Sequence, residues 1–196
     1  MALTASTMME LGTLAPMFTL TDVRTGAAIS PQRSGRPLLV MFICCHCPFV
    51  VHVREELGRL GRDYDGKVDI IAISANDADK YSADSPENLK KMADEFGFTF
   101  ALCHDTTQDV AKRYTAACTP DFFLFDAEHK LAYRGQLDGS RPSNQIAVDG
   151  RDLRAAVDAL LGGRTPTKTQ YPSVGCNIKW TAGQEPAYFA SALVKK

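Results

Sequence analysis

The sequence predicts a three-layer α/β domain in which helices flank a central β-sheet. Two observations predict this class. Apolar runs of strand length alternate along the chain with segments whose apolar residues recur at helical spacing. In addition, the stretch Cys44-Cys45-His46-Cys47-Pro48 lies where one apolar run passes into a helical pattern. Thiols are therefore placed at a strand-to-helix junction, which becomes the first candidate for a reaction site.

The first predicted elements surround that junction. Residues 18–22 and the Thr25-Gly26 turn predict a short hairpin or an extended lead-in. Residues 38–43 are apolar throughout, which is typical of a buried parallel strand. Residues 49–60 carry apolar side chains at helical spacing, and we expect Gly61 to end this helix.

The later elements repeat the alternation and include a hairpin. Ser85-Pro86-Glu87 predicts a helix start, because Pro is favoured in the first position and acids in the first turn. Glu128-His129 predicts the turn between two successive strands, so the sheet is expected to be mixed. The expected elements are strand 68–73, helix 86–96, strand 100–102, helix 110–114, strands 122–126 and 131–134, and helix 149–161 with Gly162-Gly163 as its stop.

Length and composition fit one folded domain. The chain has 196 residues, 45% of them hydrophobic, and a formal net charge of −1, which argues against a nucleic-acid interface. No run approaches the roughly 20 apolar residues of a membrane span, and we expect a cytoplasmic protein without a signal peptide. Residues 1–163 are expected to form the domain, with an N-terminal extension. Residues 164–196 are expected to form an irregular C-terminal tail that packs on this domain or on a partner.

Cys47 is the leading candidate for a nucleophile. Pro48 suits the first position of the helix, which makes Cys47 the residue that caps its N-terminus. Unpaired N–H groups and the positive end of the helix dipole favour a thiolate there and lower its pKa. The other cysteines have plainer interpretations: Cys44 fits equally well as a buried small apolar residue, and Cys103, Cys118 and Cys176 fit better as packed side chains.

Several further motifs carry a resemblance that extends from Pro16 to Pro186. They are Cys44-x-His46-Cys47-Pro48-Phe49-Val50, Asp84-Ser85-Pro86-Glu87-Asn88, residues 117–126, residues 133–138, Ser140-Arg141-Pro142 and residues 173–180. Together they resemble the peroxiredoxin-like branch of the redoxin family, which comprises alkyl hydroperoxide reductases and thiol-specific antioxidant proteins. The resemblance implies a thioredoxin-like fold. It also implies that Cys47 is similar to the first active-site cysteine of thioredoxin, and that Thr119-Pro120 is similar to the cis-proline loop facing it.

The sequence also departs from the relatives that it resembles. Thioredoxin carries a second cysteine three residues after the first, where this chain has Val50. Peroxiredoxins hold the peroxide oxygens with a Thr or Ser, a Pro and an Arg, and the matching positions here are Cys44, Val40 and Pro120. The usual resolving thiol and the usual peroxide-binding groups are therefore both missing.

Two thiols are candidates for resolving an oxidised Cys47. Cys44 is the first choice, because a Cys-x-x-Cys turn can close if it brings the Cα atoms within about 4.4–6.8 Å. Cys118 is the second choice, because the resemblance places it on the facing loop. A vicinal disulfide through Cys45 would be strained. We expect His46 to stabilise a neighbouring thiolate.

These residues support three hypotheses of function. The favoured one is a thiol-disulfide oxidoreductase with an antioxidant or thiol redox role, in which the Cys47 thiolate attacks a disulfide or an oxidant. The first alternative is a one-cysteine or atypical two-cysteine thiol peroxidase. The second is a non-catalytic scaffold or metal-binding protein, with ligands among Cys44, Cys45, His46, Cys47 and Cys103-His104. A closed tetrahedral zinc site usually takes two pairs of ligands from separate parts of the chain, and the second pair is missing here. We therefore expect no metal, and we also expect no cofactor.

The favoured hypothesis implies particular partners. They are a thiol reductant, either thioredoxin or a low-molecular-weight thiol, and a substrate that is a peroxide or a protein disulfide. Neither nucleic acid nor a membrane is expected as a partner. The C-terminal tail is a candidate contact in a homodimer.

Overall fold

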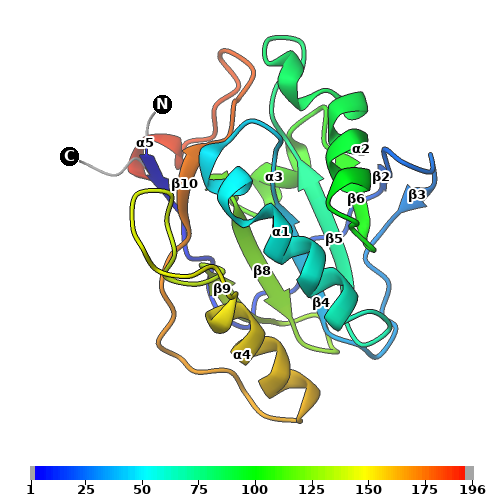
Figure 1. Ribbon diagram of the computed structural model, residues 1–196, viewed down its shortest axis with the longest axis vertical. Helices are drawn as coiled ribbons and strands as arrows, with labels where there is room; N and C mark the ends of the chain where they lie inside the picture. The colour runs from blue at the N-terminus through cyan, green and yellow to red at the C-terminus, as the bar shows by residue number, and fades with distance from the viewer. Residues whose placement is uncertain (1–2, 193–196) are drawn as a thin grey trace.

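The core of the protein is a mixed five-stranded sheet, seen in a computed structural model that describes residues 3–192 (Figure 1). The strand order is β6-β5-β4-β8-β9. β4 (Leu38–Phe42), β5 (Asp69–Ser74) and β6 (Ala101–His104) run parallel, and β8 (Asp121–Phe125) and β9 (Leu131–Gly135) run antiparallel to their neighbours. The predicted mixed sheet is therefore confirmed.

Helices cover both faces of this sheet, which gives the three predicted layers. α1 (Pro48–Asp63), α2 (Pro86–Glu95) and α4 (Arg151–Leu161) pack on one face, with α1 lying across the front of the sheet in Figure 1. The short helix α3 (Asp109–Arg113) packs on the other face. Alternate residues of β4 serve the two layers, as the period of a strand requires. Leu39 and Met41 belong to the core beneath α1, whereas Leu38, Val40 and Phe42 belong to the core beneath α3.

The boundaries of the helices follow local sequence signals, with one exception. α1 and α2 begin at Pro48 and Pro86, and the side chain of Ser85 caps α2. The prediction that Gly61 ends α1 is wrong, because α1 continues to Asp63. Gly61 is buried within the helix, where an added Cβ would lie 2.9 Å from the ring of Phe100. This glycine permits close packing instead of stopping the helix.

The remaining short elements connect or flank the main sheet. β2 (Leu20–Thr21) and β3 (Ala28–Ile29) pair as the expected hairpin. η1 (Ser82–Asp84) is a 3-10 turn directly before α2. None of the helices formed by residues 3–192 combines the length and the apolar character that crossing a membrane requires.

A second, three-stranded sheet joins the two ends of the chain to the middle. Its order is β1 (Leu3–Ala5), β10 (Val174–Asn177) and β7 (Cys118–Thr119). Most of residues 164–192 lack regular secondary structure, as expected, but β10 and the short helix α5 (Phe189–Ala192) are exceptions. Because Cys176 is the register partner of Thr119, this sheet brings the C-terminal tail to the Thr119-Pro120 loop.

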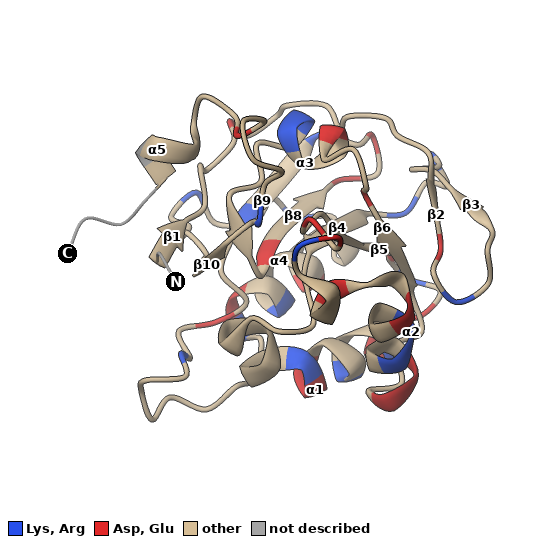
Figure 2. Ribbon diagram, turned by 90° about the horizontal axis from the view of Figure 1, so that it is seen from above, with Lys and Arg blue, Asp and Glu red and all other residues tan. Residues whose placement is uncertain are grey.

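Charged side chains are interleaved on the surface. Figure 2 shows both basic and acidic residues on α1 and on α2, in keeping with the net charge of −1. Neither of these two helices therefore carries charges of one sign only.

Candidate active site

Cys47 lies at the N-terminus of α1, at the carboxyl end of β4. Its backbone is extended, with φ −69° and ψ 122°, and Pro48 follows as the first helical residue. The side chain is fully buried, and its Sγ lies 3.1 Å from the carbonyl oxygen of Thr119. The peptide bond between Thr119 and Pro120 is cis. The structure thus places Cys47 against the Thr119-Pro120 loop, as the resemblance implied.

Two further thiols hydrogen-bond to the Cys47 sulfur. They are Cys176 of β10 and Cys44, which follows β4. These S–H groups, with Cys176 the stronger influence, hold the pKa of Cys47 far below its ordinary value, assisted by the backbone N–H of Val50 and opposed by burial. The pKa values of Cys44 and Cys176 are raised in return, because each is hydrogen-bonded to Cys47 and partly desolvated. One thiolate shared by two thiol donors is therefore the favoured protonation state.

The Thr119 carbonyl distinguishes the two protonation states of Cys47. A neutral Cys47 can donate its S–H proton to this carbonyl across the 3.1 Å contact. A thiolate can only accept, so its stability depends on the S–H groups of Cys44 and Cys176, on the Val50 N–H and on the Thr119 hydroxyl. The hydroxyl of Thr119 adds a contact to Cys44, with Oγ1 3.3 Å from Sγ. The site therefore carries a hydrogen-bond partner for either form of Cys47.

Asp84 anchors the loop that carries the cysteines. Its buried carboxylate accepts hydrogen bonds from the backbone N–H groups of Cys45 (2.8 Å) and His46 (3.3 Å), and from the Asn76 amide (2.7 Å). The His46 Nδ1 atom lies 2.6 Å from Asp84 Oδ2, and the His46 ring stacks on Tyr81 with an interplanar angle of 5°. The imidazole is thus directed at Asp84, whereas the hydrogen-bond donors to the Cys47 sulfur are Cys176, Cys44, Val50 and the Thr119 hydroxyl.

Cys118 lies in the facing strand, as expected, but its thiol is directed elsewhere. Its Sγ donates to the carbonyl oxygen of Pro120 at 3.5 Å. Burial raises its pKa well above the ordinary value, and the nearby charges of Asp121 and Cys47 raise it further. Cys44, Cys47 and Thr119 are therefore brought into direct contact, whereas Cys118 lies beside them.

The remaining two cysteines have surroundings that disfavour reactivity. Burial, followed by the charge of Asp84, raises the pKa of Cys45 to about 12. Burial likewise raises the pKa of Cys103 to about 12, and Cys103 belongs to the core on the opposite face of the sheet from Cys47.

Sequence reasoning missed two residues of this site. Asp84 stands directly before the helix cap Ser85, a position with no strong signal for a buried anchor. Cys176 lies in a segment without periodicity and was expected to be merely packed. The only sequence signal for both is their place in the motifs that carry the family resemblance.

One set of side chains among residues 3–192 has the composition of a metal site. Potential ligand atoms of Cys44, His46 and Asp84 lie within 4.8 Å of one another. Both Asp84 oxygens already accept N–H hydrogen bonds from the loop or from Asn76. The raised pKa of Cys44 also opposes the thiolate that a metal would require. The arrangement therefore suits an anchored loop better than a cation.

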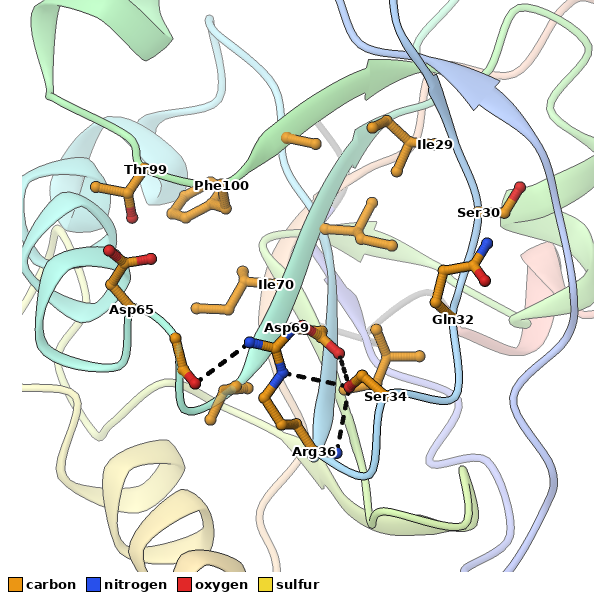
Figure 3. Close-up of a pocket in the computed structure, with 16 residues that line it drawn as sticks. Ile29, Ser30, Gln32, Ser34, Arg36, Asp65, Asp69, Ile70, Thr99 and Phe100 are labelled. Atoms are coloured by element: carbon orange, nitrogen blue, oxygen red, sulfur yellow. Dashed lines mark hydrogen bonds and ion pairs between the residues drawn. The ribbon is translucent and has the colours of Figure 1, made fainter.

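A pocket lies at the opposite end of the sheet from the cysteines. This pocket has a volume of about 410 Å³, and its lining includes Leu38, Asp69 and Ala101 at the amino ends of β4, β5 and β6. Figure 3 shows the side chains that line it. Three of its polar residues contact one another: Arg36 pairs with Asp69 at 2.5 Å, and Ser34 also hydrogen-bonds to Asp69. The reactive thiols follow the carboxyl end of β4, so this pocket is separate from their chemistry.

The fold and the thiol cluster define a class of protein, a redoxin with a thioredoxin-like fold. Residues 11–134 match the model of the AhpC/TSA family, and the chain belongs to this family. The predicted family and fold are therefore confirmed. A search of the curated proteins gives no match.

Solved structures share the fold. An uncharacterized conserved protein from Geobacillus kaustophilus is 51% identical, with a TM-score of 0.91 over 93% of this chain and 98% of its own. A hypothetical protein from Sinorhizobium meliloti 1021 is 46% identical, with a TM-score of 0.89 over 92% of this chain and 100% of its own. A secreted disulfide oxidoreductase from Mycobacterium tuberculosis shares the fold at 18% identity, with a TM-score of 0.57 over 73% of this chain and 96% of its own.

Proposed function

We propose that this redoxin is a thiol-disulfide oxidoreductase that uses the Cys47 thiolate as its nucleophile. The observation that carries the proposal is the pair of S–H donors, Cys44 and Cys176, on the Cys47 sulfur at the N-terminus of a helix. A thiolate is the attacking form in thiol-disulfide exchange, and stabilised thiolates occur where donors and a helix dipole meet. The disulfide oxidoreductase from Mycobacterium tuberculosis, which shares the fold, is consistent with this chemistry.

The proposed reaction has two exchange steps. The Cys47 sulfur attacks one sulfur of a substrate disulfide, so that a mixed disulfide forms and one thiol leaves after taking up a proton. A second thiol then attacks the Cys47 sulfur and releases the other half of the substrate. The substrate gains two electrons, and the protein is left with a disulfide that an external thiol, either thioredoxin or a low-molecular-weight thiol, reduces again.

Access to Cys47 limits the kind of substrate that reacts first. The side chain is fully buried, so a neighbouring segment must move before a disulfide reaches the sulfur. A small crevice beside the site is lined in part by Phe49, Pro120 and Arg141. This crevice supports approach along the Pro120 loop. We accordingly propose small disulfides as the first substrates to test, in a reducing compartment such as the cytoplasm.

Peroxide is the alternative substrate, and membership of the AhpC/TSA family favours it. Cys44 stands where peroxiredoxins carry a hydroxyl, but the hydroxyl of Thr119 lies 3.3 Å from the Cys44 sulfur and is a substitute donor. In this reaction Cys47 would take up one peroxide oxygen as a sulfenic acid, and the other oxygen would leave as water or an alcohol.

One set of assays tests both reactions. Reduced protein is mixed with hydroxyethyl disulfide or with hydrogen peroxide, and consumption is followed with a thiol reductant present. Cys47→Ser should abolish turnover, and Cys45→Ser is the matched control that should retain it. Faster turnover of the disulfide supports the proposal, and faster turnover of peroxide selects the alternative. Turnover by Cys47→Ser at the wild-type rate would refute both.

A further inference from the structure

The position of Cys176 in the C-terminal tail indicates a role beyond packing. Its strand, β10, lies between β1 and β7, and its Cα is paired with that of Thr119. The Thr119 carbonyl oxygen in turn lies 3.1 Å from the Cys47 sulfur. The α1 helix that begins after Cys47 contacts β10 directly. Cys47 and Cys176, which are 129 positions apart in the chain, thus both lie beside Thr119.

Gly175 permits this close approach. A Cβ at residue 175 would lie 2.1 Å from the carbonyl oxygen of Thr119, a distance that only a shift of the backbone could relieve. The absence of a side chain therefore lets β10 lie against β7 immediately beside Cys47. The next residue, Cys176, then reaches the Cys47 sulfur with its own thiol.

We propose that Cys176 is the resolving thiol of Cys47, so that the redox-active disulfide joins the N-terminus of α1 to β10. This inference rests on the proposed disulfide exchange. It assigns to the C-terminal tail the role that the second cysteine of a Cys-x-x-Cys motif has in thioredoxin, where this chain has Val50.

The proposed step balances with the reaction above. After the first exchange, Cys47 is joined to half of the substrate in a mixed disulfide. The Cys176 sulfur loses its proton and attacks the Cys47 sulfur, the bond to the substrate breaks, and the departing sulfur takes up a proton. Cys47 and Cys176 together lose two electrons, and the substrate disulfide becomes two thiols.

The charges near the two rival thiols favour Cys176 over Cys44. Cys44 is next to the buried carboxylate of Asp84, whose negative charge opposes formation of a second thiolate. The positive charge of the Lys179 ammonium group favours the ionised form of Cys176, against the larger opposing effects of the hydrogen bond to Cys47 and of burial. This ammonium is held in place by hydrogen bonds to the backbone and side-chain oxygens of Asn177, at 2.8 and 3.3 Å. A resolving thiol attacks as the thiolate, so a positively charged neighbour favours Cys176 over Cys44 as the resolving thiol.

The tryptic peptides of this chain separate the possible disulfides. Cys44, Cys45 and Cys47 share the peptide 34–54, Cys118 lies in 114–130, and Cys176 lies in 169–179. A bond between Cys47 and Cys176 therefore cross-links peptides 34–54 and 169–179. A bond between Cys44 and Cys47 stays within one peptide, and a bond to Cys118 cross-links 34–54 with 114–130.

The experiment treats the reduced full-length protein with one equivalent of oxidised glutathione, followed by alkylation, tryptic digestion and mass spectrometry without reduction. Wild type and Cys44→Ser are expected to yield the 34–54/169–179 cross-link and to release both glutathione molecules. Cys176→Ser is expected to stop at a Cys47–glutathione mixed disulfide. Cys176→Ala serves as a second variant, and circular dichroism verifies that both are folded.

The outcomes separate this inference from the proposed function. A wild-type disulfide between Cys47 and either Cys44 or Cys118 overturns the role of Cys176 and leaves the oxidoreductase intact. Persistence of the Cys47–glutathione adduct in wild type has the same meaning, because resolution would then depend on an external thiol. An unmodified Cys47 overturns the oxidoreductase itself, and the inference with it.

Discussion

Asp121 is a buried carboxyl group whose ionisation should control the stability of the fold. It is the residue after cis-Pro120, and it pairs with Phe42 in the central sheet. Its side chain is fully buried, and Oδ2 lies 3.4 Å from the backbone N–H of Ala117. Burial outweighs its hydrogen bonds and raises the pKa of Asp121 from 3.8 to about 7. The folded protein therefore holds a proton that the unfolded chain releases.

The sign and the size of the effect follow from that difference in pKa. Well below pH 3.8 both states are protonated, and the stabilising contribution of the neutral acid is fully present. As the pH rises from about 4 to about 7, only the unfolded state ionises, and the free energy of unfolding falls by about 1.4 kcal/mol per pH unit. Between pKa values of 3.8 and about 7 the total loss is about 4 kcal/mol.

The test is urea unfolding of wild type and Asp121→Asn at several pH values from 4 to 8. Asparagine is close in shape to the neutral acid but cannot ionise, so the variant should gain stability relative to wild type as the pH rises through this window. Asp94→Asn, on the exposed surface of α2, is the matched control and should leave the pH dependence unchanged. Parallel pH profiles for Asp121→Asn and wild type would refute the reasoning.

Three further predictions concern the thiol site and the packing of α1. Cys44→Ala removes one S–H donor and should raise the pKa of Cys47, read from the pH dependence of thiolate absorbance; an unchanged titration would exclude this hydrogen bond. Asp84→Asn should slow disulfide turnover several-fold, because it weakens the anchor of the loop, and wild-type kinetics would contradict that role. Gly58→Ala would put a Cβ 2.2 Å from the carbonyl oxygen of Phe96 and should cost about 1–3 kcal/mol in urea unfolding, whereas a stabilised variant would show that the contact relaxes freely.

The architecture was predictable because its signals are local. The apolar run before Cys44 and the Pro at the start of α1 specify a buried strand and a helix boundary without reference to the rest of the chain. The same local logic misread Gly61, since whether a glycine stops a helix or permits packing depends on what lies opposite. Here the neighbour is Phe100, 39 positions later in the sequence.

The same distinction between local signals and contacts of distant segments applies to the candidate site. The position of Cys47 at the end of a helix follows from adjacent residues, and its chemistry follows from that position. The identity of its hydrogen-bond partners depends on the pairing of β7 with β10 and on the burial of Asp84, which are contacts between distant segments. No periodicity in the sequence of residues 164–196 predicts β10. A strand of four residues in an irregular segment is stabilised by the strands on either side of it, so its thiol could be placed only once the chain was folded.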